Sequence, residues 1–118
     1  MPFLRFHSTD AGKLSEISRK MTDLIQETLQ CPREHIVLEV IHSEIVCDGA
    51  INCGDWPFVE ISYFQRSRDL QDKVAQIVSS CLQEIGYTDS DVYFLYLDPR
   101  NYYCLLYTSP SPRDVEES

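Results

Sequence analysis

Met1-Pro2-Phe3-Leu4-Arg5-Phe6 opens the chain, and Trp56-Pro57-Phe58-Val59-Glu60 repeats its pattern of a proline followed by apolar and aromatic residues. Short runs of this composition favour β-strands. Each run is followed by a stretch with helical periodicity and then by a second β-rich run. The order strand, helix, strand therefore occurs twice. It predicts an α+β domain of two β-α-β units, with the helices packed on one face of a four-stranded mixed sheet.

Two stretches have the apolar periodicity of amphipathic helices. The first runs from Asp10 to Gln30, and Asp10 offers an N-cap side chain. Cys31-Pro32 ends it, because proline cannot continue the hydrogen-bond ladder. The second stripe runs from Leu70 to Ile85 and ends at Gly86, a residue suited to the position after a helix.

Four runs are expected to be strands, and they span residues 2–7, 35–46, 56–64 and 91–97. Asp48-Gly49 predicts a hairpin, since glycine accepts the positive φ of a tight turn. A ferredoxin-like domain has the same order of elements, and periodicity does not decide between the two arrangements.

We expect one domain over residues 1–103, with repeat units at about 2–46 and 56–98 joined by a hairpin linker at 47–55. Residues 104–118 differ in composition from the rest. Cys104 to Asp114 resembles the translation of a sequencing-library adapter, so residues 104–118 are interpreted as an artefactual, disordered tail.

The composition excludes several classes of function. The 118 residues carry a formal net charge of −9, which argues against binding to nucleic acid or to an anionic membrane surface. No apolar run is long enough to span a membrane, and the start lacks a signal-peptide pattern, so a cytoplasmic protein is expected.

The five cysteines include no C-x-x-C pair. Cys47 and Cys53 flank the predicted turn and are placed to face each other. Free thiols are nevertheless favoured over a disulfide framework or a zinc site.

The two proline-led strands resemble the tautomerase superfamily, whose 4-oxalocrotonate tautomerase type has one β-α-β unit and whose macrophage migration inhibitory factor type has two. The chain is most similar to a bacterial branch of the fused, two-unit kind, over residues 1–103. The matching stretches are Met1 to Phe6, Leu38-Glu39, Asp48-Gly49, Trp56 to Glu60, Phe64-Gln65-Arg66, Gln71-Asp72 and Tyr102-Tyr103. The resemblance implies a homotrimer with sites between subunits.

The same resemblance implies that Pro2 is a catalytic base. Removal of Met1 would leave a secondary amine at Pro2, and an apolar pocket or a nearby cation would lower the pKa of that amine. A base with a pKa near neutrality suits proton abstraction beside a carbonyl. Pro57 cannot act in this way, because its nitrogen belongs to an internal amide.

A 2-oxo acid also needs a partner for its carboxylate, and arginine binds carboxylates through two parallel hydrogen bonds. In fused relatives the loop before the second helix carries substrate-binding arginines, which makes Arg66 the first candidate and Arg68 the second. The alternative is that both arginines are solvated residues at the start of a helix. The resemblance places Val37 where single-unit relatives have an arginine.

Three further expectations concern polar residues on the strands. Arg5 is expected on the opposite sheet face from Pro2, with Glu60 as its partner. Glu39 can orient an arginine, take part in hydration chemistry or face solvent, and the last is favoured. The tyrosines that can polarise a carbonyl or pack at an interface are Tyr93, Tyr96, Tyr102 and Tyr103.

The leading hypothesis is an amino-terminal-proline tautomerase acting on a small 2-oxo or 2-hydroxy-dienoic acid, with this anionic metabolite as its partner. One alternative is a non-catalytic scaffold or binding protein with the same fold, and another is a ferredoxin-like regulatory domain. His7, His35 and His42 lack the spacing of metal ligands, so neither a metal nor a cofactor is expected.

Overall fold

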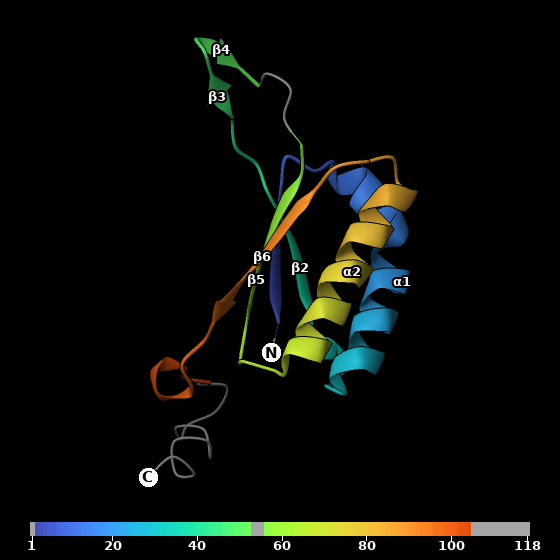
Figure 1. Cartoon of the computed structure of the whole chain (residues 1–118), viewed down its shortest axis with the longest axis vertical. Coiled ribbons are helices and arrows are strands. Elements are labelled where there is room, and N and C mark those ends of the chain that lie inside the picture. Colours follow the sequence, from blue (N-terminus) through green and yellow to red (C-terminus); the bar gives the residue numbers. More distant parts are fainter. Residues whose placement is uncertain (1, 53–55, 105–118) are drawn as a thin grey trace.

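The computed structural model describes residues 2–52 and 56–104. Two helices cover one face of a four-stranded sheet (Figure 1), which confirms the predicted α+β fold. The main elements are β1 (Phe3–His7), α1 (Ala11–Leu29), β2 (Val37–Ile41), β5 (Phe58–Tyr63), α2 (Arg68–Glu84) and β6 (Asp91–Tyr96).

The strand order is β2-β1-β5-β6. The outer pairs β1–β2 and β5–β6 are parallel, and the central pair β1–β5 is antiparallel. The two parallel strands of each β-α-β unit are therefore direct neighbours. In a ferredoxin-like domain another strand lies between them, so this topology excludes that alternative.

The two units also correspond at their first residues. The Val37 amide donates to the Pro2 carbonyl at 3.1 Å, and the Asp91 amide donates to the Pro57 carbonyl at 3.1 Å. Since β1 and β5 are antiparallel, these matching prolines lie at opposite ends of the sheet.

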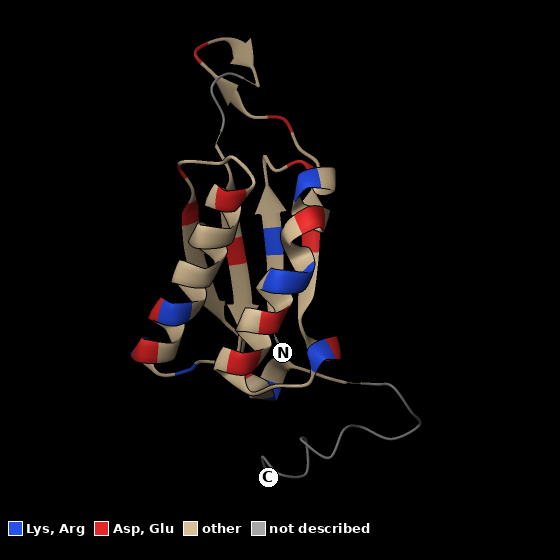
Figure 2. Ribbon diagram, turned by 90° about the vertical axis from the view of Figure 1, so that its right-hand side faces the viewer, with Lys and Arg blue, Asp and Glu red and all other residues tan. Residues whose placement is uncertain are grey.

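Alternation along the strands places the core between the sheet and the helices. Leu4 and Phe6 of β1 and Val59 and Ile61 of β5 are fully buried, while their neighbours in sequence point to the other face. The helices contribute Leu14, Ile17, Met21, Ile25 and Leu29 from α1 and Val74, Val78, Cys81 and Leu82 from α2. Charged residues are distributed over both helices in the turned view (Figure 2).

The helix ends agree closely with the prediction. Asp10 caps α1 by accepting a hydrogen bond from the Lys13 amide at 2.9 Å, and Gln30 ends it in the left-handed region. Ser67 caps α2 in the same way by accepting from the Leu70 amide. Gly86 follows α2 with φ 105°, as its place in the sequence predicts.

The expected strand at 35–46 is wrong in its length, because β2 ends at Ile41. Its partner β1 ends at His7, which pairs with Ile41, so no strand remains beside the residues that follow. Those residues lead into a separate hairpin of β3 (Val46–Cys47) and β4 (Ala50–Ile51), which projects from the body (Figure 1). Asp48 and Gly49 form its turn with φ of 48° and 80°, as predicted.

The cysteine prediction is partly wrong. Cys31, Cys81 and Cys104 are free thiols, but Cys47 is disulfide-bonded. The sequence does not reveal this, because spacing alone cannot bring two sulfur atoms together. Cys53 and the predicted tail beyond Cys104 lie outside the described residues. Within the described part of the chain, none of the helices has the length and apolarity needed to cross a bilayer.

The cap of α1 can be tested by substitution. We expect Asp10→Ala to lower the free energy of unfolding by about 1 kcal/mol, because the Lys13 amide loses its acceptor. Asp10→Asn keeps an acceptor and serves as the control. Urea unfolding of both variants measures the difference, and equal losses would contradict the capping role.

Candidate active site

Pro2 lies where β1 begins, at one end of the sheet. Its side chain is fully buried, and its carbonyl is held by the Val37 amide. Phe3 pairs with Ser62, so the register places Pro2 opposite Tyr63, the last residue of β5. Both residues are on the face that the helices cover, which keeps the surroundings of Pro2 largely apolar.

Tyr63 is part of a hydrogen-bonded cluster at this end. The Tyr63 and Tyr96 hydroxyls both donate to Oε1 of Gln71, at 3.2 and 2.8 Å. Tyr63 pairs with Tyr96 in the sheet, and Gln71 lies in the first turn of α2. The cluster therefore ties the ends of two strands to the start of a helix.

Burial raises the pKa of Tyr63 to about 12, with a further contribution from Tyr96, while Arg66 acts in the opposite direction. The Tyr63 phenol therefore stays protonated near neutral pH. It is not a base under those conditions.

Arg66 contacts the same tyrosine. Its guanidinium carbon lies 5.9 Å from the centre of the Tyr63 ring. Its Nε is buried and has no hydrogen-bond partner among the described residues, although the residue as a whole is only half-buried. An unpaired buried donor costs free energy, so an acceptor brought to this position would be stabilised.

Arg66 thus contacts Tyr63, the residue that the strand register places opposite Pro2. Arg68 is exposed at the first residue of α2 and is not brought into this group by any described contact. Sequence reasoning missed the role of Gln71 altogether. The sequence placed Gln71 in a stretch that carries the family resemblance and at the start of an amphipathic helix, but neither signal gave it a role.

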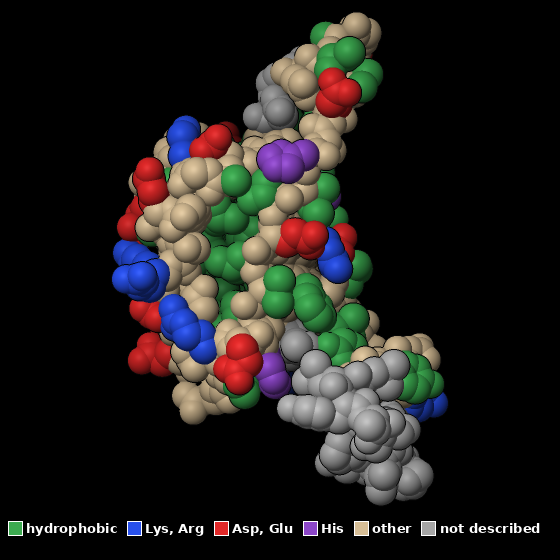
Figure 3. Space-filling view, turned by 180° about the vertical axis from the view of Figure 1, so that it is seen from behind, with side chains coloured by type: hydrophobic (Ala, Val, Ile, Leu, Met, Phe, Trp, Pro, Cys, Tyr) green, Lys and Arg blue, Asp and Glu red, His purple; other side chains and the backbone are tan. Residues whose placement is uncertain are grey.

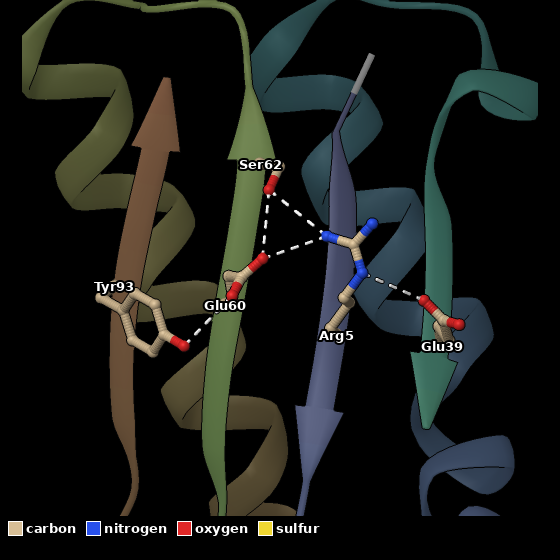
Figure 4. Close-up of polar contacts among 5 residues, drawn as sticks. All are labelled: Arg5, Glu39, Glu60, Ser62 and Tyr93. Atoms are coloured by element: carbon tan, nitrogen blue, oxygen red, sulfur yellow. Dashed lines mark hydrogen bonds and ion pairs between the residues drawn. The ribbon is translucent and has the colours of Figure 1, made fainter. Parts of the chain in front are cut away.

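The opposite face of the sheet carries a second polar group, which we call the polar rung (Figure 4). It contains Glu39, Arg5, Glu60 and Tyr93, which are directly opposite one another on the four strands. Arg5 lies 3.4 Å from Glu39 and 3.1 Å from Glu60, and the Tyr93 hydroxyl donates to Glu60 at 3.2 Å.

The predicted Arg5–Glu60 pair is present. Glu39 is exposed, as favoured, and its carboxylate also contacts Arg5. Arg5 is 37% exposed, and ion pairs this open contribute about 0–1 kcal/mol. The polar rung therefore fixes the side chains of one row across the four strands. It lies on the opposite face of the sheet from Pro2.

The other aromatic candidates are scattered. Tyr102 packs edge-on against Phe64 at 5.3 Å, and Tyr103 is exposed. The tyrosines predicted as alternatives therefore do not converge on one point.

A hollow of roughly 600 Å³ lies at the far end of the sheet, between Trp56-Pro57 and the loop from Gly86 to Asp91. It borders the residue that corresponds to Pro2, but Pro57 has no free amine. The volume of this hollow is therefore no evidence for a catalytic site, and we place the candidate site at Pro2. Among the described residues, no group of three or more histidine, cysteine or acidic side chains is arranged to hold a metal ion.

The raised pKa of Tyr63 predicts a loss of stability in alkali. Between pH 10 and about 12 the unfolded chain releases this proton while the folded chain keeps it, so stability is complete below pH 10 and falls as pH rises through this window. Tyr63→Phe removes the effect. We expect the difference in unfolding free energy between wild type and variant, measured in urea, to shrink across the window. A constant difference would contradict the assignment.

Comparison with known proteins identifies a family and a fold. The sequence matches the family described as Domain of unknown function (DUF1904) over residues 1–104. A search of curated proteins finds no significant match. Among solved structures, the chain is similar to a DUF1904 domain from Sebaldella termitidis ATCC 33386, with 22% identity, coverage of 89% of this chain and 96% of that one, and a TM-score of 0.81.

Two further solved structures share the fold. One is the macrophage migration inhibitory factor-like protein of Entamoeba histolytica, with 15% identity, coverage of 86% and 92%, and a TM-score of 0.66. The other is a fused 4-OT wild-type symmetric trimer, with 10% identity, coverage of 88% and 92%, and a TM-score of 0.71. Likenesses at such identities show the fold, and they confirm the one that the resemblance predicted.

Proposed function

The chain belongs to the family described as Domain of unknown function (DUF1904), and from that premise we propose that it is an amino-terminal-proline tautomerase. Its substrate is a small 2-oxo or 2-hydroxy-dienoic acid. Pro2 is the base, Arg66 is the main carboxylate-binding residue, and Arg68 is an auxiliary cation at the entrance.

One observation carries the proposal. Arg66 lies beside Tyr63, the residue that the register places opposite Pro2, and its buried Nε has no partner among the described residues. A carboxylate is a strong acceptor for a guanidinium donor, and its binding would satisfy the unpaired nitrogen.

The surroundings of Pro2 suit a neutral amine. Burial disfavours the ammonium form, and the positive charge of Arg66 acts in the same direction. Once Met1 is removed, the Pro2 nitrogen takes the proton from the enol oxygen and delivers it to the far carbon of the enol double bond, while the oxygen-bearing carbon becomes the carbonyl. One proton moves between two atoms of the substrate, so a single base is sufficient.

Arg68 also fits an auxiliary role. A cation at the first residue of a helix is unfavourable, because the helix N-terminus already carries partial positive charge. Its exposed guanidinium is available to attract an anionic substrate towards Arg66.

A homotrimer with sites between subunits is part of the proposal. Val37, Tyr93 and Leu95 are exposed on the sheet face that carries the polar rung. Val46 and Ile51 on the projecting hairpin are 68% and 62% exposed. The hairpin holds hydrophobic side chains away from the rest of the domain (Figure 3). Assembly would cover apolar surface that one small domain leaves open, and a fused 4-OT is described as a symmetric trimer.

The catalytic role of Pro2 is tested with phenylpyruvate and 2-hydroxymuconate, after intact mass has shown that Met1 is removed. We expect Pro2→Ala to lower kcat about 10²- to 10⁴-fold, the range for loss of a general base. Pro57→Ala is the matched control, because Pro57 begins the corresponding strand of the second unit. Equal rates for wild type and Pro2→Ala would place catalysis elsewhere or nowhere, and no turnover by either protein would favour the alternative, a non-catalytic scaffold of the same fold.

The assembly is tested by light scattering on a size-exclusion column. We expect a mass three times the 13.7 kDa of the chain. Val46→Asp and Leu95→Asp would place charge on the exposed apolar surfaces and are expected to release monomer. A wild-type protein that elutes as a monomer at micromolar concentration would contradict the trimer.

A further inference from the structure

Two groups of N–H donors at the site point to a ligand with several acceptor positions. One is Arg66 Nε, buried and unpaired within the described part of the chain. The other is the Gln71 side-chain amide. Its oxygen already accepts two hydroxyl donors, whereas its Nε2 donates to no acceptor among residues 2–52 and 56–104.

The two tyrosines determine how Gln71 is oriented. The Tyr63 and Tyr96 hydroxyls both direct their hydrogens at Oε1, so the amide is held with its oxygen towards the tyrosines. The Nε2 hydrogens must then point away from the pair. Since both phenol protons are engaged, neither tyrosine has a free donor for a substrate carbonyl.

Gln71 and Arg66 flank the same ring. The Arg66 guanidinium lies over the face of Tyr63, and Gln71 accepts from its hydroxyl, so both side chains contact one tyrosine at the end of β5. A carboxylate has about four lone-pair positions and accepts from an arginine and an amide together.

We infer that Gln71 is a second carboxylate-binding residue, which acts beside Arg66, and that Tyr63 and Tyr96 are positioning residues that hold its amide. The ligand class is a small carboxylate bound next to aromatic rings. The identification of that ligand as a 2-oxo acid substrate rests on the proposed function, but the binding pair does not depend on turnover.

Gln71→Glu tests the inference with little change of shape. The carboxylate keeps an acceptor for both tyrosines but replaces the N–H donors with a negative charge. Gln76→Glu makes the same change of charge at an exposed position of α2 and is the matched control. We expect Gln71→Glu to raise KM for phenylpyruvate about 10-fold or more with kcat changed only a few-fold, and Gln76→Glu to leave both constants near wild type.

Tyr96→Phe distinguishes a role of Tyr96 in positioning Gln71 from a direct role of its hydroxyl in catalysis. If Tyr96 holds Gln71, its loss raises KM a few-fold and leaves kcat near wild type. If its hydroxyl polarises the substrate carbonyl, kcat falls about 10²-fold at constant KM, and that result would overturn the positioning role.

Binding of phenylacetate, which has no oxo group to tautomerise, distinguishes failure of the inference from failure of the proposed function. We expect calorimetry to show binding by wild type and Gln76→Glu, and a loss of about 10-fold or more in Gln71→Glu. If binding follows this pattern but phenylpyruvate is not turned over, the proposed enzyme activity is contradicted and the carboxylate-binding site is still supported. Equal binding by wild type and Gln71→Glu would overturn the role of Gln71, whether or not the protein is an enzyme.

Discussion

The antiparallel pairing of β1 with β5 is the constraint on which the rest of the structure depends. It joins two parallel β-α-β units head to tail, so that corresponding residues lie at opposite ends of one sheet. It also sets Pro2 opposite Tyr63 and Phe3 opposite Ser62. A slip of one residue would turn Tyr63 to the other face and separate it from both Pro2 and Gln71. The register of the central pair therefore assembles the candidate site.

The two faces of the sheet have different chemistry. The helix-covered face is a dry core with a neutral hydrogen-bonded cluster at one end, where the Tyr63 phenol keeps its proton up to high pH. The open face carries the polar rung, in which Arg5 stands between two carboxylates. The rung has one more negative charge than positive, and it remains half in contact with water.

The sequence predicted much of this fold, because hydrophobic period and capping residues are local signals. The helix from Ala11 to Leu29 follows from its apolar stripe, with Asp10 before it and Pro32 after it. The length of β2 was not predictable in the same way, since Ile41 is its last residue only because His7 ends the partner strand. Strand length here is a property of pairing rather than of composition.

The candidate site was predictable only in part, because strand pairing brings some of its residues together. Pro2 and Arg66 were identified from a family resemblance that fixes their places in the chain. Gln71 becomes visible only when β5 and β6 are paired, because its role comes from two hydroxyls on neighbouring strands. Glu39 is exposed, as the sequence favoured, but its contact with Arg5 depends on the strand register and no sequence pattern reveals it.

The hydrogen bond from the Val37 amide to the Pro2 carbonyl has a consequence for maturation. Proline has no N–H, so the first residue of the strand is held to the sheet through its carbonyl alone. Trimming of the initiator methionine thus costs the ladder no hydrogen bond at Pro2. Under the proposed function, a folded chain that keeps Met1 would be a latent form, because its Pro2 nitrogen is an amide and not a base.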